Sequence, residues 1–202
     1  MRTLGILLAG GRGTRLGAGV PKALVTLGGV TLLERGLATL RACCDDVVVT
    51  APVDMVLPEH SADERRDIVG VEGPLSGILA GMSSVEPFGR ALVLAVDMPF
   101  VRAEALQAIG DRLGDAIAIL PAPRGRVQPL AAWYAGAAYP SLLGTMAAGG
   151  RSIVSAALAL FPEIVHDAVL ATLPGGLEQF FNLNTPADLQ EAARRMAQEG
   201  AA

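Results

Sequence analysis

The sequence is poor in lysine, aromatic residues, cysteine and charge. Charged residues make up 18% and aromatic residues 4% of its 202 residues, whereas hydrophobic residues make up 51%. This balance excludes an intrinsically disordered chain, which combines low hydrophobicity with high charge. The formal net charge is −4. Because nucleic-acid-binding domains usually show a basic face, we expect no nucleic-acid partner.

Long apolar runs are absent as well. None reaches the roughly 20 residues that a helix needs to cross a bilayer, and the N-terminal residues lack the cleavage pattern of a signal peptide. The two cysteines, Cys43 and Cys44, are neighbours in a predicted helix, and such a pair is no disulfide framework. We therefore expect buried structural thiols in a cytoplasmic protein without membrane contact.

Lysine occurs once. Lys22 is the only lysine among 16 basic residues, so arginine supplies positive charge everywhere else in the chain. It stands shortly after a glycine-rich stretch, residues 10–19. This position favours a specific role over that of a solvated surface charge.

Short apolar runs alternate with helical spacings, which is typical of βαβ units. The predicted strands are 3–8, 47–50, 68–71, 91–96, 116–120, 129–134, 163–170 and 178–183. The predicted helices are 31–42, 75–85, 102–113, 135–148, 151–160 and one that Thr185 caps and Pro186 begins. Thr31 and Glu34 form a capping-box pattern at the start of the first helix, and Asp188 strengthens the start of the last one. The pattern loosens over residues 121–170, where an antiparallel strand would fit. We predict one α/β domain over residues 1–202, a three-layer sandwich around a mostly parallel, Rossmann-like sheet.

The loop after the first strand has the composition of a phosphate-binding loop. Its glycines allow the backbone to approach an anion and aim N–H groups at it, and nearby basic residues add positive charge. The spacing does not fit a Walker A loop, and it fits a dinucleotide fingerprint only imperfectly because Gly17 stands one residue late. A dinucleotide-binding loop and a glycine-rich turn without a ligand remain as alternatives. The predicted phosphate-binding residues are Leu8, Ala9, Gly10, Gly11, Arg12, Gly13, Arg15 and Lys22.

Two further segments end at the same predicted edge of the sheet. Asp97 follows the most apolar strand, where a carboxylate can hold Mg²⁺ on a triphosphate; the alternative is a helix-capping role. Gly73-Pro74-Leu75 opens a helix whose unpaired backbone groups can read a base edge, and the alternative is a plain turn. Asp67 precedes this turn and is either a nucleotide contact or a solvated carboxylate.

A third group of polar residues suits a second, anionic substrate. Asn182 and Asn184 flank one apolar residue at the carboxyl end of the predicted strand 178–183, so in an extended chain they would face the same side. The alternative for Asn184 is a turn residue ahead of Thr185. Arg124, Arg126 and Gln128 lie in a loop after another strand, and a solvated surface loop is the equal alternative. The two histidines have no partner at metal-ligand spacing, so no role is assigned to them.

Five segments together resemble one known family, the molybdenum cofactor guanylyltransferases (MobA). They occur in the family's order between residues 8 and 189. The matching residues are Leu8-Ala9-Gly10-Gly11 with Pro21-Lys22, Gly73-Pro74-Leu75-Ser76-Gly77, Asp97-Met98-Pro99, Gln128-Pro129-Leu130 with Tyr134, and Asn182-Leu183-Asn184-Thr185-Pro186 with Asp188-Leu189.

The resemblance implies transfer of GMP from GTP to molybdenum-molybdopterin, with release of pyrophosphate. It implies that Asp97 is the magnesium ligand and a catalytic residue together with Arg15 and Lys22. It also implies that Asp67 and Gly73-Pro74-Leu75 contact the nucleotide, and it implies a molybdoenzyme or chaperone as protein partner. We take Gln128, Asn182 and Asn184 as the residues that orient the second substrate. The alternatives are a cytidylyltransferase, another nucleotidyltransferase acting on a small phosphate, and a non-catalytic nucleotide-binding adaptor.

Overall fold

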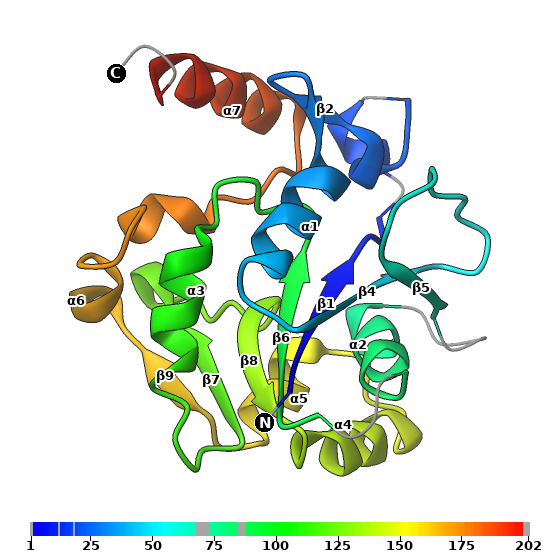
Figure 1. Cartoon of the computed structure of the whole chain (residues 1–202), viewed down its shortest axis with the longest axis vertical. Coiled ribbons are helices and arrows are strands. Elements are labelled where there is room, and N and C mark those ends of the chain that lie inside the picture. Colours follow the sequence, from blue (N-terminus) through cyan, green and yellow to red (C-terminus); the bar gives the residue numbers. More distant parts are fainter. Residues whose placement is uncertain (1, 12, 18, 68–72, 85–87, 200–202) are drawn as a thin grey trace.

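A seven-stranded sheet forms the centre of the molecule (Figure 1). The computed structural model describes residues 2–11, 13–17, 19–67, 73–84 and 88–199. The order of strands across the sheet is β5-β4-β1-β6-β8-β7-β9. Their bounds are β1 Thr3–Leu8, β4 Asp46–Ala51, β5 Asp63–Arg66, β6 Arg90–Ala95, β7 Ala118–Pro121, β8 Ala131–Ala135 and β9 Glu163–Val165. A separate two-stranded hairpin pairs β2 (Thr26–Leu27) with β3 (Val30–Thr31).

The sheet is mostly parallel, as predicted. Strand β1 runs parallel to both β4 and β6, and β5 and β9 are parallel to their neighbours. Strand β8 is antiparallel to β6 and β7 and lies within the stretch where the sequence pattern loosens.

Helices cover both faces of the sheet (Figure 1). Their bounds are α1 Leu32–Arg41, α2 Pro74–Met82, α3 Ala103–Gly110, α4 Ala138–Ala147, α5 Ile153–Leu158, α6 Asp167–Leu170 and α7 Pro186–Glu199. Buried side chains of α1 and α3 pack in one core layer, and those of α2, α4 and α5 pack in a second. No helix in the described part of the chain is long and apolar enough to span a membrane.

Strand β1 separates the two core layers. All six of its residues are buried, and successive side chains enter opposite layers: Leu7 packs on the α1 side, and Ile6 and Leu8 pack on the α2 side. This alternation follows from the two-residue period of a strand. It explains why the strand is apolar throughout.

The predicted caps of two helices are confirmed. Thr31 caps α1 and accepts a 3.1 Å hydrogen bond from the Glu34 amide, while the Glu34 carboxylate accepts from the Thr31 amide at 2.9 Å. Helix α7 begins at Pro186, directly after Thr185. Because these caps satisfy backbone donors that a helix start leaves free, both starts were visible in the sequence.

Three predictions about secondary structure were wrong. Residues 178–183 form no strand, because the 3₁₀ helix η4 (Gly176–Phe180) occupies the first half of this stretch and the rest is irregular. The buried side chain of Gln179 closes that turn through bonds from its amide group to the carbonyls of Pro174 and Gly176. Residues 163–170 form the short strand β9 followed by helix α6 rather than one strand.

The third error concerns the cysteines. Cys43 and Cys44 follow the end of α1 instead of lying within it, and both are free thiols. Burial raises the pKa of Cys43 to about 11 and also raises that of Cys44, so both thiols stay protonated at neutral pH. The predicted strand 68–71 lies outside the described residues.

Two helical glycines test how tightly the layers pack. A Cβ at Gly81 on α2 would lie 2.7 Å from Cγ2 of the buried Ile6, whereas a Cβ at Gly144 on α4 would meet nothing within 4 Å. We expect Gly81→Ala to destabilise the protein by about 1–3 kcal/mol through overpacking. Gly144→Ala should stabilise it by up to about 1 kcal/mol. Urea unfolding of both variants measures this difference, and equal effects would contradict the packing described.

Candidate nucleotide-binding and transfer site

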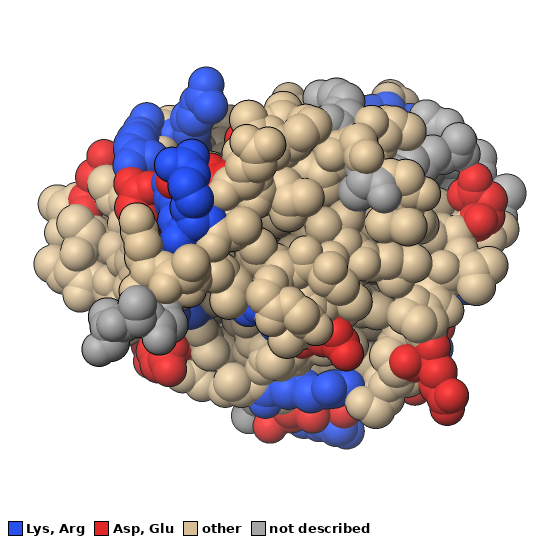
Figure 2. Space-filling view, turned by 90° about the horizontal axis from the view of Figure 1, so that it is seen from above, with Lys and Arg blue, Asp and Glu red and all other residues tan. Residues whose placement is uncertain are grey.

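A cavity of about 460 Å³ opens where the carboxyl ends of β1, β4 and β6 meet. The chain leaves β1 toward β4 on one side and returns to β6 on the other, so this edge is a topological switch point, where α/β proteins bind ligands. Figure 2 looks onto the end of the molecule toward which β1 and β6 point in Figure 1. Most of that surface is uncharged. The cavity is lined by Leu8, Gly10, Gly11, Lys22, Thr50, Pro52, Asp67, Gly73, Pro74, Gly77, Ala95, Val96, Asp97, Leu130 and Asn184.

Glycines bend the loop after β1 back on itself. Gly11 and Gly13 have φ angles of 113° and 64°, in the region that side chains disfavour. A Cβ at Gly13 would also lie 2.7 Å from the Val20 carbonyl oxygen. The Lys22 amide then donates to the Gly11 carbonyl at 3.1 Å. This closure brings Lys22 beside the glycines that it follows in the sequence.

Lys22 is held at the centre of the site. It begins the 3₁₀ helix η2 (Lys22–Leu24), which the fully buried Ala23 anchors in the core. Its Nζ atom lies 3.0 Å from Oδ2 of Asp97 and 2.9 Å from Oδ1 of Asn184. The side chain is only 13% exposed. Lys22 is therefore a largely buried charge with two oxygen partners, as its isolated occurrence in the sequence suggested.

Asp97 has one carboxylate oxygen to spare. It follows β6, and Oδ2 accepts the hydrogen bond from Lys22, while Oδ1 is buried without a hydrogen-bond partner in the described structure. Carboxylate oxygens are the ligands that Mg²⁺ prefers, and Mg²⁺ commonly binds through one or two carboxylates plus substrate phosphates. The described residues contain no cluster of three or more metal-ligating side chains. Asp97 thus fits a divalent cation that takes its remaining ligands from a nucleotide and water.

Asn184 reaches Lys22 from a segment near the other end of the chain. The Leu183 amide donates to the Asp97 carbonyl at 2.8 Å, and the Leu183 side chain is buried. Oδ2 of Asp188 accepts hydrogen bonds from the amides of Asn184 at 2.9 Å and Thr185 at 2.8 Å. In the sequence, Asp188 was indicated as a residue of a helix start and as part of the last segment that resembles the family. The structure shows that it also fixes the backbone that presents Asn184.

The opposite end of the cavity offers two oxygen acceptors, which come from Thr50 and Asp67. The hydroxyl of Thr50, at the end of β4, is buried without a hydrogen-bond partner in the described structure. Asp67 is half-buried, and this burial raises its pKa. A Cβ at Gly77 would lie 2.8 Å from Oγ1 of Thr50 and 3.1 Å from Oδ1 of Asp67. Glycine at position 77 therefore allows both acceptor side chains to lie close against α2. Sequence analysis missed Thr50, which looks like an ordinary strand residue.

A second cavity, of about 440 Å³, adjoins the first. Gln128, Asn182 and Asn184 line it together, and Asn184 lines both cavities. The buried hydroxyl of Tyr134 donates to the Pro129 carbonyl at 2.8 Å and thereby fixes the segment that carries Gln128. The remaining lining residues are Pro123, Arg124, Arg126, Leu177, Glu178, Phe180, Phe181 and Asp188.

The predicted site residues are placed unequally. Those that line the first cavity are Leu8, Gly10, Gly11, Lys22, Asp67, Gly73, Pro74 and Asp97. Ala9 and Leu75 are buried and do not line it, and Gly13 shapes the loop from outside. Arg12 and the side chain of Arg15 lie outside the described part of the structure. Asn182 and Asn184 lie in an irregular segment, not on a strand. The conformation of this loop, and not the two-residue period of a strand, therefore brings both to the second cavity.

Comparison with known proteins gives a consistent family. Residues 5–164 match a family model described as MobA-like NTP transferase domain. The chain is 34% identical to the molybdenum cofactor guanylyltransferase of Cereibacter sphaeroides, over 95% of this chain and 96% of that protein. It is 30% identical to a protein of Natronomonas pharaonis named probable molybdenum cofactor guanylyltransferase, over 96% and 98% of the two chains.

Solved structures agree with this match. Molybdopterin-guanine dinucleotide biosynthesis protein A of Archaeoglobus fulgidus superposes with a TM-score of 0.80 at 28% identity, covering 96% of this chain and 99% of that chain. The 2-C-methyl-D-erythritol 4-phosphate cytidylyltransferase of Thermus thermophilus has a TM-score of 0.68 at 21% identity, covering 95% and 98%. The second likeness concerns the fold alone.

The stability of the folded protein as a function of pH tests whether the Asp67 carboxylate is buried in the cavity as described. A raised pKa means that the ionised carboxylate costs stability in the folded state. With Asp67 protonated, the protein keeps its full stability at pH values below the pKa of this residue in the unfolded chain. It loses that stability as the pH rises through the pKa of Asp67 in the folded protein. Asp67→Asn should therefore have a higher Tm than the wild type at pH 7, and the difference should shrink as the pH falls and vanish below the unfolded pKa of about 3.9.

The matched control is Asp63→Asn on β5, where the side chain is 69% exposed. Its effect should stay within about 0.5 kcal/mol at both pH values. Thermal unfolding across pH measures both variants. A lower Tm for Asp67→Asn at pH 7 would show that the carboxylate stabilises the fold.

Proposed function

Because the chain belongs to the MobA-like NTP transferase family, we propose that it transfers GMP from GTP to molybdenum-molybdopterin. Pyrophosphate leaves, and the guanine dinucleotide form of the cofactor results. The observation that supports this proposal best is the meeting of two cavities at Asn184, whose side chain contacts Lys22. One cavity suits a nucleotide, and the other suits the acceptor.

The first cavity has groups for both ends of GTP. Backbone N–H groups of the glycine loop and the ammonium of Lys22 suit the phosphates. Asp67 and Thr50 supply oxygen acceptors at the other end. Guanine presents N–H donors on its base-pairing edge, and a carboxylate is an acceptor for them. A pocket of this kind discriminates against bases that would leave its acceptors unpaired.

Catalysis in this proposal rests on positioning and charge neutralisation. A phosphate oxygen of the acceptor attacks the α-phosphorus of GTP in line, and pyrophosphate departs. The ammonium of Lys22 gives up its contact with Asp97 and binds a phosphate oxygen instead. Its contact with Asn184 remains and keeps it at the junction of the two cavities. Asp97, once free of Lys22, would hold Mg²⁺, which neutralises charge on the triphosphate when bound.

The same proposal places the other components of the reaction. Gln128 and Asn182 orient the acceptor in the second cavity, beside Asn184. The reaction takes place in the cytoplasm, and the product passes to a molybdoenzyme or its chaperone. Arg15 contributes a second positive charge to the phosphate loop.

Two substitutions test the assigned chemistry. Asp97→Asn keeps the shape of the side chain but loses its charge, and we expect turnover to fall by about 100-fold or more. Lys22→Arg replaces a compact ammonium by a planar fork, and a misplacement of about 1 Å should cost roughly 100-fold. Pyrophosphate release with GTP, Mg²⁺ and molybdenum-molybdopterin measures both. The control is Arg41→Lys, an exchange of the same two residue types at an exposed residue that ends α1, and it should leave turnover unchanged. Wild-type turnover in both site variants would remove these residues from the mechanism.

The choice of nucleotide is a separate prediction. With the same acceptor, GTP should support product formation far faster than CTP, because the acceptors at Asp67 and Thr50 match donors of guanine. The assay compares initial rates at equal concentrations of the two nucleotides. Equal or faster turnover with CTP would instead favour a cytidylyltransferase.

A further inference from the structure

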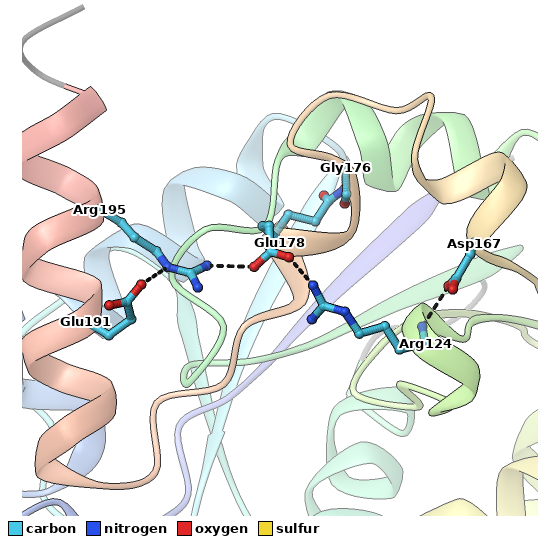
Figure 3. Close-up of polar contacts among 7 residues, drawn as sticks. Arg124, Asp167, Gly176, Glu178, Glu191 and Arg195 are labelled. Carbon is cyan, nitrogen blue, oxygen red and sulfur yellow. Dashed lines mark hydrogen bonds and ion pairs between the residues drawn. The ribbon is translucent and has the colours of Figure 1, made fainter.

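Glu178 lies between two arginines at the rim of the second cavity (Figure 3). One carboxylate oxygen pairs with the guanidinium of Arg124, which belongs to the 3₁₀ helix η3 (Pro123–Gly125). The other oxygen lies 3.2 Å from Nη1 of Arg195 on α7. The carboxylate of Glu178 therefore connects its own segment to η3 and to α7.

The two arginines are held very differently. The guanidinium of Arg195 lies 4.5 Å from the ring centroid of Phe181, and its Nε atom lies 2.8 Å from Oε1 of Glu191. Its side chain is only 27% exposed. The Arg124 side chain is 64% exposed, and Arg124 lines the second cavity, whereas Arg195 lines a different one. Arg195 is thus a structural link, and Arg124 is a charge that faces the acceptor cavity.

The backbone of Arg124 is strained. Its φ and ψ angles are 53° and 34°, the left-handed region that L-residues with a side chain rarely adopt. Its amide donates to Oδ1 of Asp167 at 2.7 Å, which holds the loop in this conformation. Glycine would adopt the same backbone without strain. Since strained residues persist where the surroundings enforce them and cluster at ligand sites, the strain points to a use for the side chain.

We propose that Arg124 binds an anionic group of the acceptor substrate, and that Glu178 occupies its guanidinium until the acceptor arrives. This inference rests on the function proposed above. A guanidinium fork pairs with carboxylates and phosphates in the same geometry, so an oxyanion of the acceptor can replace the carboxylate of Glu178. The exchange is easy because an ion pair this exposed contributes little stability. After the exchange, Arg195 keeps Glu178 in place, and Glu191 in turn holds Arg195.

The experiment compares three variants by their KM for molybdenum-molybdopterin and for GTP. Arg124→Gln should raise the KM for the acceptor by about 10-fold, the effect of one charged hydrogen-bonded contact, and leave the KM for GTP unchanged. Arg194→Gln is the matched control, because it removes an exposed arginine of α7 that pairs with Glu191 and does not line the acceptor cavity, and it should leave both KM values unchanged. Glu178→Gln removes the competing charge and should lower the KM for the acceptor.

A fourth variant separates binding from structure. Arg124→Gly relieves the backbone strain, so it should raise the Tm by about 2 °C while it raises the acceptor KM as Arg124→Gln does. A purely structural role for the arginine would lower the Tm instead. Inorganic phosphate identifies the anionic group: loss of its competitive inhibition in Arg124→Gln indicates the acceptor's phosphate, and unchanged inhibition indicates its molybdenum-bound end.

Two results would overturn the inference. The first is an unchanged acceptor KM in Arg124→Gln, and the second is a raised KM in Glu178→Gln, which would show that the ion pair itself builds the site. Both results require that the wild-type protein forms product in the same assay. If the wild type forms no product from GTP and molybdenum-molybdopterin, the proposed function itself fails and takes this inference with it.

Discussion

The contact of one ammonium with two oxygens organises this molecule. Lys22 lies within 3.0 Å of both Asp97 and Asn184, which are 75 and 162 positions away in the sequence. A largely buried ammonium needs such partners, since an unpaired buried charge is costly. The glycine loop, the end of β6 and the segment before α7 must therefore meet at one point.

The rest of the fold serves to hold these three segments. Strands β1 and β6 are neighbours and parallel, so the loops that follow them begin at the same edge of the sheet. The Leu183 amide binds the Asp97 carbonyl, and Asp188 secures the backbone of Asn184. Because Asn184 also lines the second cavity, the residue that orients Lys22 is the residue that the two substrates would share. The contacts that position Lys22 would thus also position the two substrates for the transfer.

Local rules made much of this predictable from the sequence. The apolar runs of β1 and β6, the caps of α1 and α7, and the charged residues that follow strands all have short-range signals. Composition alone singled out Lys22, which is isolated among 15 arginines. The site residues that escaped prediction depend on long-range contacts. Thr50 becomes special only because α2 brings Gly77 against it. For Arg124, the sequence left open a role in binding the second substrate and a place on the surface, because its contacts with Asp167 and Glu178 are long-range as well. Residues 178–183 were mistaken for a strand because Phe180 and Phe181 both pack on the core, whereas the buried side chain of Gln179 determines the backbone of the turn at 176–180.

A crystal structure with a non-hydrolysable GTP analogue and Mg²⁺ tests the central claim most directly. The account predicts the nucleotide in the cavity between Gly11 and Asp67, with Nζ of Lys22 on a phosphate oxygen and still on Oδ1 of Asn184, and with Asp97 released to the cation. A nucleotide bound elsewhere, or one bound in this cavity with the pair of Lys22 and Asp97 intact, would contradict it.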